Sequence, residues 1–135
     1  MPECPFCLPA VEPQIVLSDQ WCYSAFTQDT GTPVGSAMVL PLAHRPTVFD
    51  LTEQEWASTA SLLHQMKEII TAEYSPDGWN VGWNVQTVGG QSIPHAHCHL
   101  VPRYADEPLA GRGIRSWIKD PANRPPRAQL PPVAR

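Results

Sequence analysis

Three histidines alternate with apolar residues in the second half of the chain, at His95, His97 and His99. Successive side chains of a β-strand point to opposite faces, so His97 and His99 share one face and His95 enters it. The intervening residues belong to the other face and are expected to be core: Ala96, Cys98 and Leu100. Burying three imidazoles together without partners is unfavourable. This face is therefore predicted to be a functional site.

Two kinds of chemistry use such a row of imidazoles. In the first, all three rings ligate a catalytic metal that keeps an open position for water. In the second, one ring attacks phosphorus as a nucleophile while its neighbours bind the phosphate. The preceding loop favours the nucleophile, because Gly89 and Gly90 let backbone N–H groups approach an anion and the side chains of Gln91 and Ser92 add donors.

Two cysteines near the N-terminus, Cys4 and Cys7, have a spacing that is used both in redox pairs and in zinc sites. A redox pair normally follows a strand and begins a helix, and the prolines at positions 2, 5 and 9 oppose that context. The pair instead predicts two thiolate ligands of a tetrahedral zinc ion, which needs two further ligands. Two histidines are available for this role, His44 and His95.

The elements that position these residues are five short β-prone runs and one long helix. The strands are expected at residues 14–17, 21–26, 36–40, 79–85 and 97–103. The helix is expected to begin at a capping box of Thr52 and Glu55 and to stop at residues 75–78. Its apolar stripe is expected at Trp56, Ala60, Leu63, Met66 or Lys67, and Ile70. With a short helix within residues 110–119, the pattern predicts an α+β domain with a mainly antiparallel sheet.

Composition limits the classes of function. A chain of 135 residues and 14.9 kDa is the size of one domain, and it has neither a run of apolar residues that could span a membrane nor an N-terminal secretory signal. Residues 1–102 carry two basic side chains against ten acidic ones, whereas residues 103–135 carry seven against three. The acidic body argues against binding of duplex DNA. We expect a small-molecule partner, no nucleic acid, no membrane, and a reducing cytoplasmic setting for the four cysteines.

The stretch from Asn84 to Arg103 resembles the histidine triad (HIT) family, whose signature is His-φ-His-φ-His-φ-φ with φ apolar. More narrowly, it resembles the bacterial branch described as diadenosine tetraphosphate hydrolase-like. The resemblance covers residues 4–104 and implies a HIT-like fold, with a HIT domain over 1–104 and a basic, proline-rich extension over 105–135. It also implies nucleotidyl transfer, usually to water, by a two-fold homodimer.

The resemblance assigns roles to individual residues. It makes His97 the nucleophile that takes the α-phosphate of the nucleotide. It implies that His99, stabilising negative charge once protonated, contacts the phosphate together with Gln91. The remaining nucleotide-binding positions that it implies are Asn84, Gly90 and Ser92, with Asp29 for the ribose hydroxyls and Gln28 as the alternative.

The resemblance also completes the metal site, because some family members hold a metal with a cysteine pair, a distal histidine and the first histidine of the triad. We therefore expect one closed structural zinc site formed by Cys4, Cys7, His44 and His95. The predicted function is hydrolysis of a dinucleoside polyphosphate or nucleoside phosphoramidate through a nucleotidyl-His97 intermediate. The alternatives are a metal-dependent hydrolase that uses all three histidines, a non-catalytic nucleotide-binding module, and a transferase.

Overall fold

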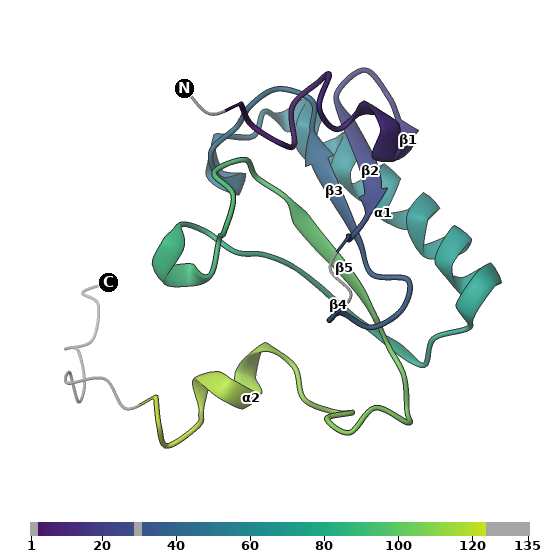
Figure 1. Cartoon of the computed structure of the whole chain (residues 1–135), viewed down its shortest axis with the longest axis vertical. Coiled ribbons are helices and arrows are strands. Elements are labelled where there is room, and N and C mark those ends of the chain that lie inside the picture. The colour runs from purple at the N-terminus through teal and green to yellow at the C-terminus, as the bar shows by residue number, and fades with distance from the viewer. Residues whose placement is uncertain (1–2, 29–30, 124–135) are drawn as a thin grey trace, which may run out of the picture.

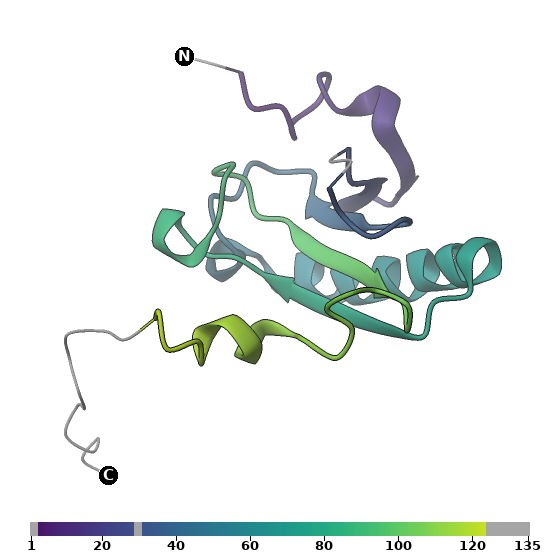
Figure 2. The same cartoon turned by 60° about the horizontal axis from the view of Figure 1, so that its bottom comes forward.

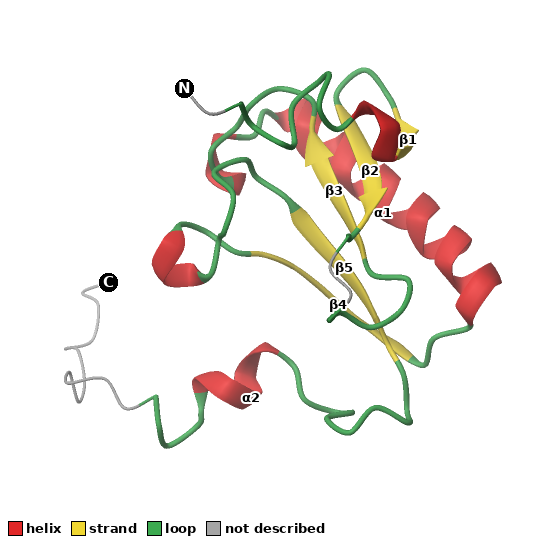
Figure 3. Ribbon diagram, in the orientation of Figure 1, coloured by secondary structure: helices red, strands yellow, loops and turns green. Residues whose placement is uncertain are grey.

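The computed structural model describes residues 3–28 and 31–123, which form a five-stranded antiparallel sheet with helices beside it (Figures 1 and 3). The strands lie in the order β1-β2-β3-β5-β4, so β1 and β4 are the sheet edges. Their bounds are β1 Ile15–Ser18, β2 Cys22–Phe26, β3 Ala37–Pro41, β4 Gly78–Trp83 and β5 Cys98–Arg103. The helices are α1 Glu53–Tyr74 and α2 Ile114–Ile118, with short 3₁₀ turns at Glu12–Gln14, Val48–Asp50 and Thr87–Gly89. The predicted α+β fold is confirmed.

The long helix α1 begins at the predicted capping box. The Thr52 hydroxyl accepts from the Glu55 backbone N–H at 3.2 Å, and the Glu55 carboxylate accepts from the Thr52 N–H at 2.8 Å. The helix ends at Ser75, which adopts the left-handed conformation with φ 49°. The two boundaries predicted from local signals are therefore correct.

The buried stripe of α1 differs from the predicted one. Leu62 is 2% exposed, whereas Trp56 is 47% exposed and leans on the Trp83 ring at a centroid distance of 5.9 Å. The residues that face the sheet are Glu55, Ser58, Thr59, Leu62, Met66 and Ile70. Met66 and Ile70 are buried as predicted, whereas at the other three positions the buried residue is the one before the predicted residue: Glu55, Thr59 and Leu62. Small polar residues were not expected in the core, but Thr59 fits there because its hydroxyl donates to the Glu55 carbonyl at 2.8 Å.

The sheet is covered on both faces over β1, β2 and β3. On one face α1 packs against a cluster that includes Val39, Cys98 and Leu100. On the other face the N-terminal segment, residues 3–14, covers Tyr23, Met38 and neighbouring residues (Figure 2). Cys22 and Cys98 are buried free thiols in the core, as expected.

Strands β4 and β5 are shorter than predicted. The last paired residues at one end are Trp83 and Cys98, so Asn84 and His97 lie just beyond the ladder. The chain leaves the sheet at this point to form the loop of residues 84–94. Within the described residues, no helix is long and apolar enough to cross a membrane.

Candidate active site

The histidine row lies where the chain enters β5. The residues between the histidines are buried as predicted, with Ala96 at 1%, Cys98 at 1% and Leu100 at 3% exposure. His99 is paired in register with Met38 of β3 and Gly82 of β4, and it points to the face opposite α1. The rings of His97 and His99 are adjacent, with centroids 4.8 Å apart. The sequence pattern therefore placed two imidazoles side by side on one face.

His97 is oriented by the backbone next to it. Its Nδ1 lies 2.8 Å from the His95 carbonyl oxygen, which can only accept, so Nδ1 carries the proton. The other ring nitrogen, Nε2, then has a free lone pair. The ring also meets the edge of Phe6 at a centroid distance of 5.2 Å. This tautomer is the one that a nucleophilic imidazole requires.

His99 sits in a drier place than a surface histidine. Burial lowers the pKa of His99 below its ordinary value of 6.5, and the neighbouring His97 lowers it further. The lowered pKa favours the uncharged ring, whose N–H can donate to a phosphate oxygen. The stabilisation of negative charge by a protonated His99 stays a prediction.

The glycine-rich loop is held by the side chain of Gln91. Its Oε1 accepts from the Gln86 N–H at 2.7 Å, while its Nε2 donates to the carbonyls of Pro46 at 2.6 Å and Ile93 at 3.0 Å. Both amide hydrogens are thus engaged by backbone oxygens. Gln91 thus fixes the shape of the loop that offers the backbone donors, and its expected contact with phosphate stays a prediction.

The backbone conformation at position 90 requires a glycine. Its φ is +98°, a left-handed value that side chains rarely adopt, and an added Cβ would lie 3.5 Å from the Asn84 carboxamide carbon. The Asn84 carboxamide therefore lies beside the loop at Gly90. The side chains of Asn84 and Ser92 are both exposed. Asp29 lies outside the described residues. Its alternative, Gln28, donates through Nε2 to the Phe26 carbonyl at 3.1 Å.

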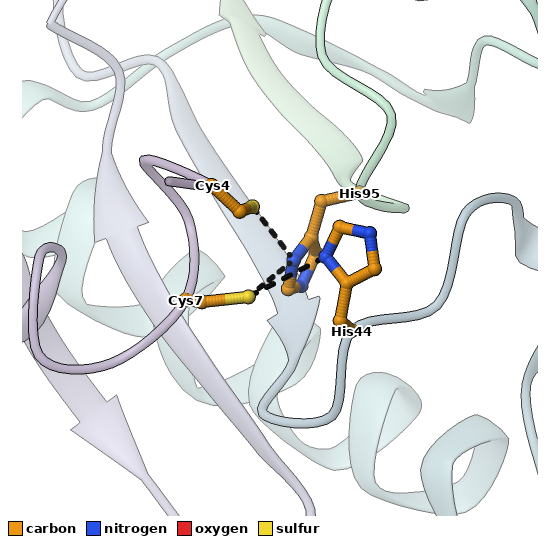
Figure 4. Close-up of side chains that lie close together, drawn as sticks. All are labelled: Cys4, Cys7, His44 and His95. Carbon is orange, nitrogen blue, oxygen red and sulfur yellow. Dashed lines mark hydrogen bonds between the residues drawn. The ribbon is translucent and has the colours of Figure 1, made fainter. Parts of the chain in front are cut away.

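The four predicted metal ligands converge. One ligand atom from each of Cys4, Cys7, His44 and His95 lies within 4.8 Å of all the others. Figure 4 shows them arriving from the N-terminal segment, from the turn after β3 and from the turn before β5. His95 Nδ1 lies 3.4 Å from the Cys4 sulfur and 3.5 Å from the Cys7 sulfur, and His44 Nδ1 lies 3.4 Å from the Cys7 sulfur.

This donor set fits a zinc ion. Zinc–sulfur bonds of about 2.3 Å and zinc–nitrogen bonds of about 2.0–2.1 Å at tetrahedral angles separate sulfur from nitrogen by about 3.6 Å. The observed separations are close to that value. The second nitrogen of His95 donates to the Pro41 carbonyl at 2.9 Å, which turns Nδ1 toward the sulfurs. Four protein ligands leave no open position for a catalytic water.

One short segment, residues 44–46, connects all these parts. His44 is one of the four converging ligands, the Arg45 carbonyl accepts from the Ala96 N–H at 2.7 Å, and the Pro46 carbonyl accepts from Gln91. The Arg45 guanidinium in turn meets the carboxylate of Glu55 at 2.9 Å, and Glu55 is only 2% exposed. Sequence reasoning found Glu55 only as a helix cap and did not assign a role to Arg45. No local signal pairs them, because the pairing depends on where α1 docks.

The ring of Phe6 is also part of the site, against the ring of His97. It lies between the two cysteines, and the Phe6 carbonyl accepts from the buried Tyr23 hydroxyl. His64, by contrast, is exposed on α1, away from the proposed ligands.

Comparison with known proteins gives consistent matches. The sequence matches the HIT domain over residues 10–106. A bis(5′-adenosyl)-triphosphatase of Saccharomyces cerevisiae is 30% identical over 100 residues, which is 70% of this chain and 46% of that protein. The chain thus spans about half the length of that relative. An adenosine 5′-monophosphoramidase of Schizosaccharomyces pombe is 28% identical over 109 residues, or 81% of this chain and 79% of that protein.

The solved structures agree on the fold. A Streptococcus mutans UA159 protein superposes with a TM-score of 0.71 at 24% identity, covering 84% of this chain and 74% of that one. A Bacillus anthracis HIT family protein superposes with a TM-score of 0.67 at 23% identity, covering 85% and 87%.

Proposed function

Because this chain belongs to the HIT domain family, we propose that it hydrolyses nucleotides at the α-phosphate through a covalent nucleotidyl-His97 intermediate. The substrates are dinucleoside polyphosphates or nucleoside phosphoramidates, the classes named for its relatives. The observation that carries the proposal is the tautomer of His97, whose Nδ1–H is bound to the His95 carbonyl while Nε2 stays available.

The reaction proceeds in two displacements at phosphorus. His97 Nε2 attacks the α-phosphorus, a nitrogen–phosphorus bond forms, and the bond to the leaving group breaks with its electron pair going to that group. The positive charge that develops on the ring is shared with the His95 carbonyl through Nδ1–H. Water then attacks the same phosphorus, the nitrogen–phosphorus bond breaks, and the nucleoside monophosphate is released. Ring nitrogen His97 Nε2 is restored.

The surrounding residues stabilise the charge on the phosphoryl oxygens. In this proposal the neutral ring of His99 and the backbone N–H groups at Gly90 to Ser92 donate to them, with Gln91 holding the loop in place. One well-placed donor of this kind is worth about 3–4 kcal/mol in the transition state. Asn84 and the Ser92 hydroxyl complete the phosphate side. Asp29, or Gln28, is kept as the proposed contact to the ribose.

The proposed metal is a structural zinc held by Cys4, Cys7, His44 and His95. When bound, it supplies a fixed link between the N-terminal segment and the start of β5. The chain's own residues then place Phe6 against the His97 ring. This assignment also supports the narrower placement in the bacterial, diadenosine tetraphosphate hydrolase-like branch. The homodimer, the cytoplasmic setting and the domain boundary at residue 104 stay predictions.

A hydrolase with one metal held by all three histidines is disfavoured by the geometry. One nitrogen of His95 is directed to the cysteine sulfurs and the other to the Pro41 carbonyl. His97 Nδ1 is likewise committed to the His95 carbonyl. A ring with both nitrogens committed, like that of His95, cannot join its neighbours around a second ion.

The test is acid quenching during turnover, followed by mass spectrometry of the intact chain. Adenosine 5′-phosphoramidate and diadenosine tetraphosphate are the two substrates. We expect an adenylyl adduct on His97, and turnover below detection in His97→Ala with wild-type folding by circular dichroism. His64→Ala, an exposed histidine on α1, is the matched control and keeps full activity. Full activity in His97→Ala would refute the nucleophile, and nucleotide binding without turnover would favour the binding module.

A further inference from the structure

The segment that follows β5 returns to the sheet face that carries the histidines. Gly82 of β4 is the register partner of His99, and paired residues of neighbouring strands point to the same face. Ile114 lies over Gly82, with its Cδ1 3.8 Å from where a Cβ on Gly82 would be. Gly113 likewise approaches the Asn80 carboxamide, 3.4 Å from its own Cβ position. Residues 109–119, which we call the C-terminal arm, therefore border the row of imidazoles.

The arm is held in this place by Arg103, the last residue of β5. Its guanidinium donates to Asn80 Oδ1 at 2.6 Å and to the carbonyls of Arg112 at 2.6 Å and Leu109 at 3.1 Å. Its Nε also meets the Glu107 carboxylate at 3.0 Å. The Arg103 side chain thus links β4, the turn at Glu107 and the arm, and Arg103 itself belongs to β5. The arm is anchored to the sheet beside the proposed active site.

The exposed side chains of the arm include an indole, three cations and the aliphatic side chains of Leu109, Ile114 and Ile118. Trp117 is 66% exposed, although an indole of this size is normally covered. Arg112, Arg115 and Lys119 of the arm are also exposed, and Arg112 and Trp117 line one hollow together. An open hollow of about 540 Å³ lies between Asn80 and these cations. Acidic side chains dominate the rest of the chain, so this group of cations differs in charge from the body that carries it.

We propose that the C-terminal arm binds the far half of a dinucleoside polyphosphate, with the cations on the distal phosphates and Trp117 stacked on the second base. This inference rests on the proposed function and makes it narrower. Each phosphate beyond the α-phosphate carries negative charge, which the basic side chains complement. A flat, exposed indole suits a nucleobase because base–aromatic stacking needs no hydrogen-bond readout.

The arm therefore discriminates between the two candidate substrate classes. Both classes share the adenylyl group and give the same adduct on His97. Only the dinucleotide has a leaving group that is long enough to offer phosphates and a second base. A phosphoramidate has an amine at that position and gains nothing from the arm.

The test compares kcat/KM for diadenosine tetraphosphate and for adenosine 5′-phosphoramidate in the full chain. Stacking on one aromatic side chain is worth about 1–3 kcal/mol, so Trp117→Ala should lower the dinucleotide-to-phosphoramidate ratio by roughly tenfold. Arg115→Ala combined with Lys119→Ala should lower the ratio further at low salt and less at high salt. The controls are Trp21→Ala, an exposed tryptophan at the β1–β2 turn, and Lys67→Ala on α1, and both should leave the ratio unchanged.

Each outcome decides the inference. A fall in the ratio that is confined to the arm variants supports it. An unchanged ratio, or a wild-type enzyme that cleaves only the phosphoramidate, overturns the proposed role of the arm. The assignment of His97 as the nucleophile is not affected by either result. If Trp117→Ala loses both activities and Trp117→Phe does not restore the ratio, Trp117 has a role in folding. This result also overturns the inference about the arm. Absence of cleavage of either substrate by the wild type overturns the proposed function and the inference together.

Discussion

The ion pair between Arg45 and Glu55 gives the sharpest test of how the site is held together. Replacing Arg45 by Met leaves the Glu55 carboxylate, 2% exposed, with the Thr52 N–H as its hydrogen-bond donor. Breaking a fully buried pair in this way costs about 3–5 kcal/mol. The Arg45 side chain is 34% exposed, so solvent screens part of the pair, and we expect a loss of about 2–3 kcal/mol.

Chemical denaturation measures this loss directly, and thermal unfolding should show a fall of about 6–12 °C for a domain of this size. Activity should fall as well, because the same segment supplies the carbonyls that bind Ala96 and Gln91. A double-mutant cycle tests the pair directly, with the single variants Arg45→Met and Glu55→Met and the double variant that combines them. We expect the combination to be more stable than either single variant, since it removes the buried charge together with its partner. A stability of Arg45→Met within about 0.5 kcal/mol of the wild type would refute this account.

Three other changes test separate parts of the site. Gly90→Ala, at φ +98°, should lower the free energy of unfolding by about 1–2 kcal/mol, measured by denaturation. It should lower kcat more than it raises KM, because the loop shifts relative to His97. Wild-type kinetics in this variant would contradict the role of the loop. Cys4→Ser should reduce zinc from about one ion per chain by elemental analysis and lower the melting temperature, and chelation of the wild type should do the same; a stable, zinc-free wild type would remove the metal site. His99→Gln should flatten the pH dependence of stability below pH 6.5. The folded-state pKa of His99 lies below the unfolded value of 6.5, so the unfolded chain binds more protons and the wild type loses stability as pH falls through that window. Denaturation at pH 7 and at pH 5 measures the difference, and equal slopes for the two proteins would contradict it.

The elements with strong local signals were predicted well. The capping box at Thr52 predicted the start of α1, and the alternation in the histidine row correctly predicted that Ala96 and Cys98 are core residues and that the rings of His97 and His99 are neighbours. The buried face of α1 was predicted in part: Met66 and Ile70 are buried as expected, but Trp56 is exposed and Glu55 is buried instead. Helical periodicity leaves two parallel stripes possible when apolar side chains flank small polar ones, and docking against β2 and β3 selects between them.

The role of Gln91 shows the same limit within the site. Its amide is a plausible phosphate donor from the sequence, yet the folded chain places the Pro46 carbonyl, 45 residues away, within 2.6 Å of it. The same holds for Arg45 with Glu55, and for the arm that Arg103 fastens beside His99. In each case the sequence offers several possible partners for one polar side chain, and the packing of the folded chain selects among them.

The sequence by itself determined the chemistry that this protein carries: imidazoles spaced for one strand face, a glycine loop before them and a cysteine pair with zinc spacing. These features depend on neighbours within a few residues, where backbone geometry dictates direction. The tertiary structure alone decided which side chains are free to act. The guanidinium of Arg45 pairs with the buried carboxylate of Glu55, and the amide of Gln91 is engaged by backbone carbonyls. Such pairings depend on how α1, the N-terminal segment and the sheet pack together, and local periodicity carries no information about that packing.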